Sequence, residues 1–193
     1  TGALLSRDQA YQYLLGAEEL AKLGLTAALR NDLKGQSQPV FKDTIADEWA
    51  RETPPFPVPG GFIKGKITDL QSRFNVNSLV AQDEAYANSQ RELLAAIMTS
   101  QQVPKEGTAM ALVRRIVDWL DANQDPMEFD GQEDLDYLSR ERPFRAANQV
   151  IFDISELILI EGIKSSELAK IAKFLSFLPP DTTKVNLNTI DEE

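Results

Sequence analysis

The chain has 193 residues, 42% of them hydrophobic and 26% charged, which is enough to bury the core of one domain or two small ones. Its 20 Lys and Arg against 30 Asp and Glu give a formal net charge of −10, which repels a phosphate backbone. The absence of Cys and His excludes disulfides, Ser-His-Asp and Cys-His catalysis, and most zinc sites. Any bound metal should therefore be a hard cation held by oxygen atoms.

Apolar residues recur at helical spacing from Leu4 to Leu29, which predicts one long helix. Its apolar stripe either covers a core of the same chain or packs against a partner helix, and the pattern leaves both interpretations open. The helix begins without a capping residue, so we expect that its first part lies upstream of residue 1. No run of roughly 18 apolar residues, as a membrane-spanning helix needs, occurs in the chain.

Residues 54–61 are rich in Pro and Gly and are predicted to form a structured loop or linker, because proline removes backbone donors. Residues 62–70 and 73–77 alternate apolar and polar side chains, which predicts two strands of an antiparallel sheet. Residues 184–188 predict a further short strand and repeat the apolar-Asn-apolar-Asn order of residues 74–77. We interpret the two Asn segments as neighbours at the base of a helical insertion, with chance similarity as the alternative.

The residues between the two Asn segments have helical periodicity. We expect helices over about 83–101, 108–120, 154–161 and 166–178. Asp153 and Glu156 have the spacing of a capping box, and Pro179 ends the last helix.

An acidic loop follows the predicted helix 108–120. It begins with oxygen-bearing side chains at the first, third and fifth positions of a calcium loop, but Pro126 and Gln132 stand where an EF-hand needs Gly and Glu. A calcium loop of another kind is one interpretation, and an ordinary solvated acidic loop is the other. The candidate calcium ligands are Asp121, Asn123, Asp125, Glu133 and Asp134.

Other residues near this loop have either a purely structural role or a role at the ion site. Trp119, Tyr137 and Phe144 are either core residues or apolar packing around an ion site. Arg145 and Asn148 either pin the loop by hydrogen bonds or lie on the surface. A carboxylate pair for glycoside hydrolysis needs a cleft that the sequence does not indicate, and the glycines form no nucleotide-binding motif.

Several segments, in order along nearly the whole chain, carry a family resemblance. They are the helix with Gln9-Ala10 and Gly16-Ala17-Glu18, then Pro57-Val58-Pro59-Gly60-Gly61, residues 69–77, 118–121, 131–134 and 143–148, and Val185-Asn186-Leu187-Asn188-Thr189. Together they resemble the K subunit of the type II secretion pseudopilus, the general secretion pathway protein K family.

The resemblance implies an α+β pseudopilin fold, a long N-terminal helix plus an antiparallel sheet, with a large inserted all-helical domain. Residues 1–78 would be the N-terminal helix, its membrane half missing, and the first strands. Residues 79–183 would be the inserted, SAM-like helical domain, and 184–193 a return strand of a domain truncated at its C-terminus.

The function implied by the resemblance is non-enzymatic. The family member is a minor pseudopilin at the pseudopilus tip that initiates and caps assembly with pseudopilins I and J, for export of folded proteins across the outer membrane. Its place is the periplasm of a Gram-negative bacterium, anchored in the inner membrane. Calcium is the expected bound ion. The expected partner-binding residues are Leu4, Leu5, Tyr11 and Leu15.

Two alternatives from other classes stay open at this point. One is a calcium-stabilised helical binding module of another kind. The other is a helix-hairpin-helix-like nucleic-acid module, for which residues 160–163 and 185–189 are the signal and the net charge of −10 the counter-argument.

Overall fold

The computed structural model describes residues 2–34, 42–182 and 185–190, which belong to two compact units. Unit 1 comprises Thr1–Ser72 and Asn186–Glu193, and unit 2 comprises Arg73–Val185. Unit 2 is thus an insertion in the sequence of unit 1. The boundaries expected from the sequence, at 79 and 183, fall a few residues inside unit 2.

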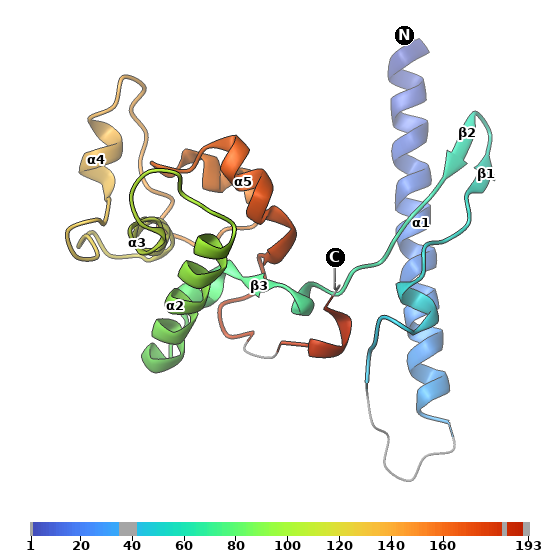
Figure 1. The fold of residues 1–193 in the computed structure, drawn as a ribbon. Coiled ribbons are helices and arrows are strands. Elements are labelled where there is room, and N and C mark those ends of the chain that lie inside the picture. Colours follow the sequence, from blue (N-terminus) through green and yellow to red (C-terminus); the bar gives the residue numbers. More distant parts are fainter. Residues whose placement is uncertain (1, 35–41, 183–184, 191–193) are drawn as a thin grey trace. The chain divides into compact units, whose positions relative to one another are not determined.

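Unit 1 begins with the long helix α1, Gly2–Asp32, which confirms the predicted first helix (Figure 1). Its 31 residues are rich in Ala and Leu, both strong helix formers. Within the unit, α1 contacts the short 3₁₀ helix η1, Glu48–Ala50, and strand β2. No helix in the described ranges is both long and apolar enough to cross a membrane.

A β-hairpin follows in unit 1. Strands β1, Phe56–Val58, and β2, Gly61–Ile63, pair antiparallel around a turn that contains Gly60 at a φ of 92°, which glycine adopts without strain. Residues 54–61, expected to form a structured loop or linker, thus contain the short edge strand β1 and the hairpin turn. Pro57 is tolerated because each strand of a two-stranded sheet is an edge strand.

The prediction that 62–70 and 73–77 are two strands of one antiparallel sheet is wrong, although the start of 62–70 does lie in an antiparallel pair. β2 pairs with β1, whereas β3, Phe74–Asn75, belongs to unit 2 and pairs in parallel with β4, Leu175–Ser176. Alternation of apolar and polar residues indicates an extended segment, but the pairing depends on which segments tertiary packing brings alongside it.

The two Asn segments share a local structure, but it is not a strand pair. The side chain of Asn75 accepts the amide of Asn77 at 3.2 Å and begins the 3₁₀ helix η3, Val76–Val80. The side chain of Asn186 accepts the amide of Asn188, also at 3.2 Å, and begins the 3₁₀ helix η6, Leu187–Thr189. The predicted return strand is wrong: residues 185–190 contain η6 and no strand, and residues 184 and 191–193 lie outside the described residues.

Unit 2 is mainly helical. Its α-helices are α2, Glu84–Ser100, α3, Ala109–Leu120, α4, Asp134–Leu138, and α5, Ser165–Ile171. Its other 3₁₀ helices are η4, Ile154–Leu159, and η5, Ala172–Phe174. The expected helix 154–161 is thus a 3₁₀ helix, begun by the predicted capping box, and the expected helix 166–178 gives way to η5 and β4 after α5.

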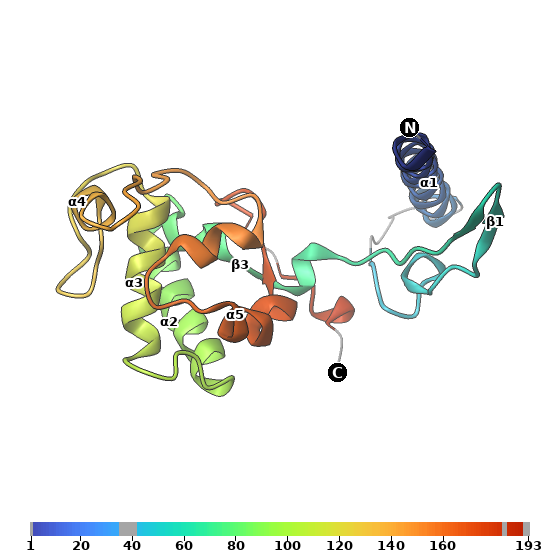
Figure 2. The same cartoon turned by 90° about the horizontal axis from the view of Figure 1, so that it is seen from above.

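Helices α2 and α3 pack against each other and against η3 around one apolar core (Figure 2). Side-chain caps fix the helix starts: Asp83 accepts the amide of Tyr86, and Thr108 accepts that of Ala111, each at 3.1 Å. The most deeply buried apolar residues are Val76, Leu79, Leu94, Met98, Val113, Ile116, Tyr137, Ile151, Leu157, Ile160 and Ile171.

Asn77 ties the two ends of unit 2 to its middle. Its amide nitrogen donates to the carbonyls of Ile151 and Leu178, both at 2.9 Å, and its oxygen accepts the amide of Ile151 at 2.9 Å. With 1% of its surface exposed, Asn77 satisfies backbone groups that would otherwise be buried without partners.

Candidate functional site: the acidic loop and the N-terminal helix

The acidic loop between α3 and α4 lies against a polar strip of α3. Most of α3 faces the core, but Arg114 and Arg115 precede Asp118 by four and three residues and therefore lie one turn before it on the same side of the helix. All three bind the loop that follows, and this common platform gives the loop its shape.

Asp118 is the centre of this platform. It is fully buried, and its carboxylate accepts the amide of Met127 at 3.0 Å and the amide of Gln132 at 2.6 Å. Burial raises the pKa of Asp118 to about 6; the two amides lower it, and the charges of Asp121 and Asp136 raise it. The loop is folded around a buried carboxyl group.

Two arginines hold the part of the loop farther from Asp118. The Arg114 guanidinium forms ion pairs with Glu128 at 2.6 Å and with Asp130 at 2.8 Å. Arg115 donates from Nε to the Asp130 carbonyl at 3.1 Å. Side chains of α3 therefore anchor the loop from Met127 to Gln132.

The first three predicted ligands form successive turns at the start of the loop. Asp121 accepts the amide of Asn123 at 3.1 Å, and Asn123 accepts the amide of Asp125 at 2.6 Å. Burial raises the pKa of Asp121, while hydrogen bonds from Asn123 and the charge of Arg91 oppose that rise. These Asx turns use one oxygen of each side chain to stabilise the loop backbone.

Glu133 is different, because its carboxylate is buried without a donor. Only 3% of the residue is exposed, and neither Oε1 nor Oε2 has a hydrogen-bond partner; Oε1 of Gln132 beside it has none either. Burial raises the pKa of Glu133 to about 7, and neighbouring negative charges, that of Asp118 first and then those of Asp121, Asp134 and Asp125, raise it further. Acceptor oxygens of this kind are the groups that a bound cation would satisfy.

Asp134, the last predicted ligand, is already engaged. Its oxygens accept from the Arg145 guanidinium and from the amide of Ala146, the latter at 3.0 Å. This confirms the interpretation of Arg145 as a residue that pins the loop region. The pinning role is not borne out for Asn148, because its amide donates to the Trp119 carbonyl of α3 at 3.0 Å and its side-chain oxygen is buried without a partner.

The aromatic residues beside the loop form one cluster. The ring centroids of Trp119 and Tyr137 lie 5.2 Å apart in an edge-on arrangement, and those of Tyr137 and Phe144 lie 5.3 Å apart. The Arg140 guanidinium lies 4.4 Å from the Tyr137 ring centroid. Trp119 and Tyr137 are buried, which confirms their interpretation as core residues.

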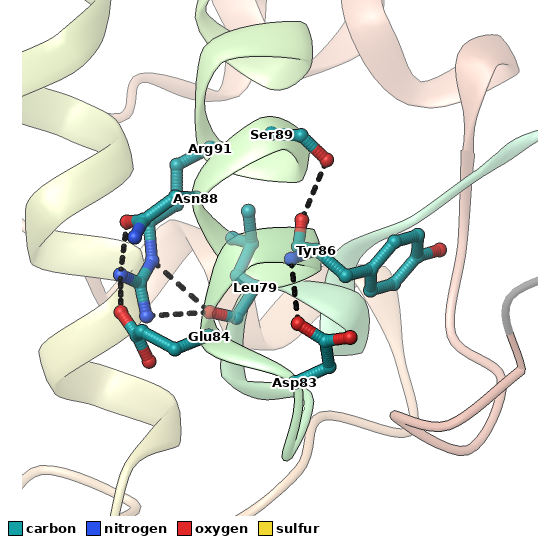
Figure 3. Close-up of polar contacts among 7 residues, drawn as sticks. All are labelled: Leu79, Asp83, Glu84, Tyr86, Asn88, Ser89 and Arg91. Atoms are coloured by element: carbon teal, nitrogen blue, oxygen red, sulfur yellow. Dashed lines mark hydrogen bonds and ion pairs between the residues drawn. The ribbon is translucent and has the colours of Figure 1, made fainter.

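Arg91 of α2 is a buried cation on the core side of the loop, and Figure 3 shows its partners. Its guanidinium donates to the Leu79 carbonyl at 3.0 and 3.1 Å, and to the side chains of Glu84 and Asn88, each at 2.8 Å. It thereby joins η3 to α2, and its charge lowers the pKa of Asp121.

The predicted ligands do not assemble into a closed metal cluster. In the parts of the chain that the structure describes, no group of three or more Asp or Glu side chains is arranged to hold a metal ion. Asp118, which organises the loop, was not among the predicted ligands. An acidic residue two positions before the end of a helix that is apolar apart from Arg114 and Arg115 is the sequence signal that could have identified it.

The second candidate site is the exposed side of α1. Tyr11 and Leu14 are each 60% exposed, and Leu15 is 39% exposed, so these side chains do not enter a core of the chain. The side chains of Leu4 and Leu5, the other two residues predicted to bind partners, lie outside the described residues.

Comparison with known proteins gives one consistent family. A family model described as "Type II secretion system (T2SS), protein K" matches residues 72–180. The type II secretion system protein K of Pseudomonas aeruginosa is 35% identical over 182 residues, covering 94% of this chain and 53% of that protein. The protein K of Aeromonas hydrophila is 30% identical over 200 residues, covering 100% and 58%. The chain thus spans a little over half the length of these relatives.

A solved structure agrees. A chain of the GspK-GspI-GspJ complex from the enterotoxigenic Escherichia coli type 2 secretion system matches with a TM-score of 0.77 and 29% identity. The match covers 95% of this chain and 64% of that chain, which supports the α+β fold with a helical domain and does not favour the nucleic-acid alternative. The chain belongs to the type II secretion system protein K family.

Proposed function

We propose that this chain is part of a minor pseudopilin that initiates and caps the type II secretion pseudopilus together with pseudopilins I and J, for export of folded proteins. The family assignment supports this, as does the similarity to a chain of a solved complex with I and J subunits. We place the protein in the periplasm, anchored in the inner membrane. Its role is mechanical rather than enzymatic: the 113-residue span of unit 2, Arg73–Val185, blocks the addition of further subunits.

The observation that carries the proposal is the exposed apolar stripe of α1, formed by Tyr11, Leu14, Leu15, Leu25 and Leu29. At about 3.6 residues per turn these five positions fall on one side of the helix. Among the described residues of unit 1, Thr189 alone is buried, so the unit offers this stripe little core of its own. The exposed Glu18–Lys22 ion pair lies on the same side of α1, between Leu15 and Leu25, so the stripe has two apolar parts, one at each end. Exposed apolar residues at this spacing mark a surface for a partner helix.

The test mixes the chain with the I and J pseudopilins of its own secretion system and measures mass by light scattering. We expect a 1:1:1 complex for the unchanged chain, and Leu14→Glu with Leu15→Glu to abolish it. Leu93→Glu, which changes a 47%-exposed apolar residue of α2, is the matched control and should assemble normally. Assembly of the α1 variant with unchanged affinity would refute the proposed docking surface.

We further infer that the acidic loop binds calcium. The residue that supports a calcium site is Glu133, whose buried carboxylate has no hydrogen-bond donor. Four neighbouring carboxylates each raise its pKa. Glu133 would hold the ion, with Asp121, Asn123 and Asp125 as the remaining candidates of the predicted set, whereas the Asp134 oxygens already bind Arg145 and Ala146. The ion would supply positive charge to oxygen atoms that no protein donor satisfies, and so stabilise unit 2.

The measurement is the melting temperature of the chain in millimolar calcium and in excess chelator. We expect a rise of several degrees with calcium, because a ligand that binds only the folded state stabilises it. Magnesium at the same concentration is the control and should have less effect, because it demands a stricter octahedral shell. Equal melting temperatures in calcium and chelator would refute the calcium proposal.

A further inference from the structure

Asp118 differs from the other carboxylates of the acidic loop in what it contacts. It is 0% exposed, and two amides of the loop, those of Met127 and Gln132, converge on its oxygens. These amides belong to residues nine and fourteen positions further along the chain. One helical side chain therefore closes the loop on itself.

The backbone opposite Asp118 is adapted to this contact. A Cβ atom at Gly131 would overlap both Oδ2 of Asp118 and the amide nitrogen of Met127, and would lie 2.9 Å from the carbonyl carbon of Pro126. Only glycine allows the chain to approach the carboxylate so closely. The sequence therefore provides the anion, the two donors and the space between them.

The loop closed in this way ends at Glu133, next to the Gln132 amide that Asp118 holds. Glu133 in turn begins α4, where its amide donates to Asp136 at 3.0 Å. The position of the unpartnered Glu133 carboxylate therefore depends on the hydrogen bonds that Asp118 accepts.

We propose that Asp118 is a positioning residue, an internal anion that folds the acidic loop before any cation arrives and so sets Glu133 in place for calcium. The positioning of Glu133 for calcium rests on the calcium proposal, whereas the folding of the loop around Asp118 does not. The cation then binds a loop that already has its shape, so Asp118 governs affinity without determining how many ions bind.

The experiment follows hydrogen exchange of individual amides by NMR in excess chelator. In the unchanged chain we expect the Met127 and Gln132 amides to exchange at least about tenfold more slowly than the amide of Phe129, whose side chain is fully exposed in the same loop. Protection that is absent in chelator and gained only with calcium would overturn the proposal, because the ion rather than Asp118 would then shape the loop.

Two isosteric variants separate the roles of the carboxylates. Asp118→Asn keeps one acceptor oxygen but loses the charge, so it should lower the protection of both amides. It should also weaken calcium binding by about 10- to 100-fold at unchanged stoichiometry, the effect expected of a residue that supports ligands. Glu133→Gln should keep the protection and lose the calcium. Loss of one bound ion in Asp118→Asn with both amides still protected would instead make Asp118 a ligand and overturn the positioning role.

Gly131→Ala provides a second route in case Asp118→Asn does not fold, because it displaces the Asp118 carboxylate while leaving its charge. It should give the same loss of protection. If the unchanged chain binds no calcium at all, the calcium proposal fails, and the exchange rates in chelator still decide whether Asp118 folds the loop.

Discussion

Asp118 and Gly131 lie so close together that no side chain larger than hydrogen fits between them. The contact joins the end of α3 to the last turn of the acidic loop, and it occurs where the Asp118 carboxylate accepts the Gln132 amide at 2.6 Å. The loop is thus part of the packed structure of unit 2.

Gly131→Ala should destabilise unit 2 by about 1–3 kcal/mol, because the added Cβ must displace a buried carboxylate or the loop backbone. The measurement is urea denaturation followed by the fluorescence of Trp119, which is buried beside the loop. Gly16→Ala is the control, since a Cβ there meets nothing within 4 Å and replaces a glycine inside a helix. An effect of Gly131→Ala within error of zero would show that the loop can move away freely.

The stability of the calcium-free chain should fall as the pH rises from about 4.5 to about 7. Glu133 and Asp118 have pKa values raised to about 7 and about 6, above their unfolded values, so the folded state binds more protons than the unfolded state in this interval. The favourable contribution is fully present below the unfolded pKa and is lost as the pH passes the folded pKa. For Glu133 the loss is about 3 kcal/mol, taking about 1.4 kcal/mol for each pKa unit.

Glu133→Gln isolates this effect. In chelator at pH 8 the variant should be more stable than the unchanged chain, because it removes a buried charge without a donor, and the fall with pH should become shallower. In millimolar calcium the order should reverse, because the variant cannot use the ion. Chemical denaturation at pH 5.5 and 8 with and without calcium measures both; an identical pH slope in the two chains would contradict the assignment to Glu133.

Asp134→Ala should destabilise unit 2 more than Arg145→Ala. Asp134 is 8% exposed, and its removal leaves the buried amide of Ala146 without an acceptor, which costs about 1–3 kcal/mol. The Arg145 side chain is 73% exposed, so its ion pair contributes only about 0–1 kcal/mol. Comparison of the two unfolding free energies checks the ranking, and equal losses would mean that the ion pair rather than the amide matters.

Asn77→Ala should be among the most damaging substitutions in unit 2, with a loss of about 3 kcal/mol or more. It removes three hydrogen bonds at 2.9 Å and leaves backbone groups of Ile151 and Leu178 buried without partners. Asn188→Ala is the control from the second Asn segment, since Asn188 is exposed. The measurement is the melting temperature of both variants relative to the unchanged chain. A small decrease for Asn77→Ala would show that water replaces the hydrogen bonds of Asn77.

The helices were the part of the fold most accessible from the sequence. The apolar spacing of α1, α2 and α3 and the capping box of Asp153 and Glu156 are local signals, and the structure places helices at each. The strand pairings were not accessible from the sequence. β3 pairs with β4 across about a hundred residues, and pairing over such a separation depends on how the helices between them pack.

The candidate site divides in the same way. The sequence indicated the acidic loop and allowed the contact of Arg145 as one of two alternatives, since both depend on charged residues near one another in the chain. It did not indicate that Asp134 is engaged by protein donors while Glu133 has none, because the two residues are adjacent and chemically alike. Only the packed loop assigns them different surroundings.

By itself the sequence determined the helices α1, α2 and α3, the capping box of Asp153 and Glu156, the absence of Cys and His chemistry, and the family. These follow from the composition and from local spacing, because residues three or four positions apart lie on the same face of a helix. The tertiary structure alone decided the strand pairings, the burial of Asp118 and the isolation of Glu133. Burial and hydrogen bonding depend on residues distant in the chain, and a carboxylate becomes structural or available for a ligand only when its neighbours have been brought to it.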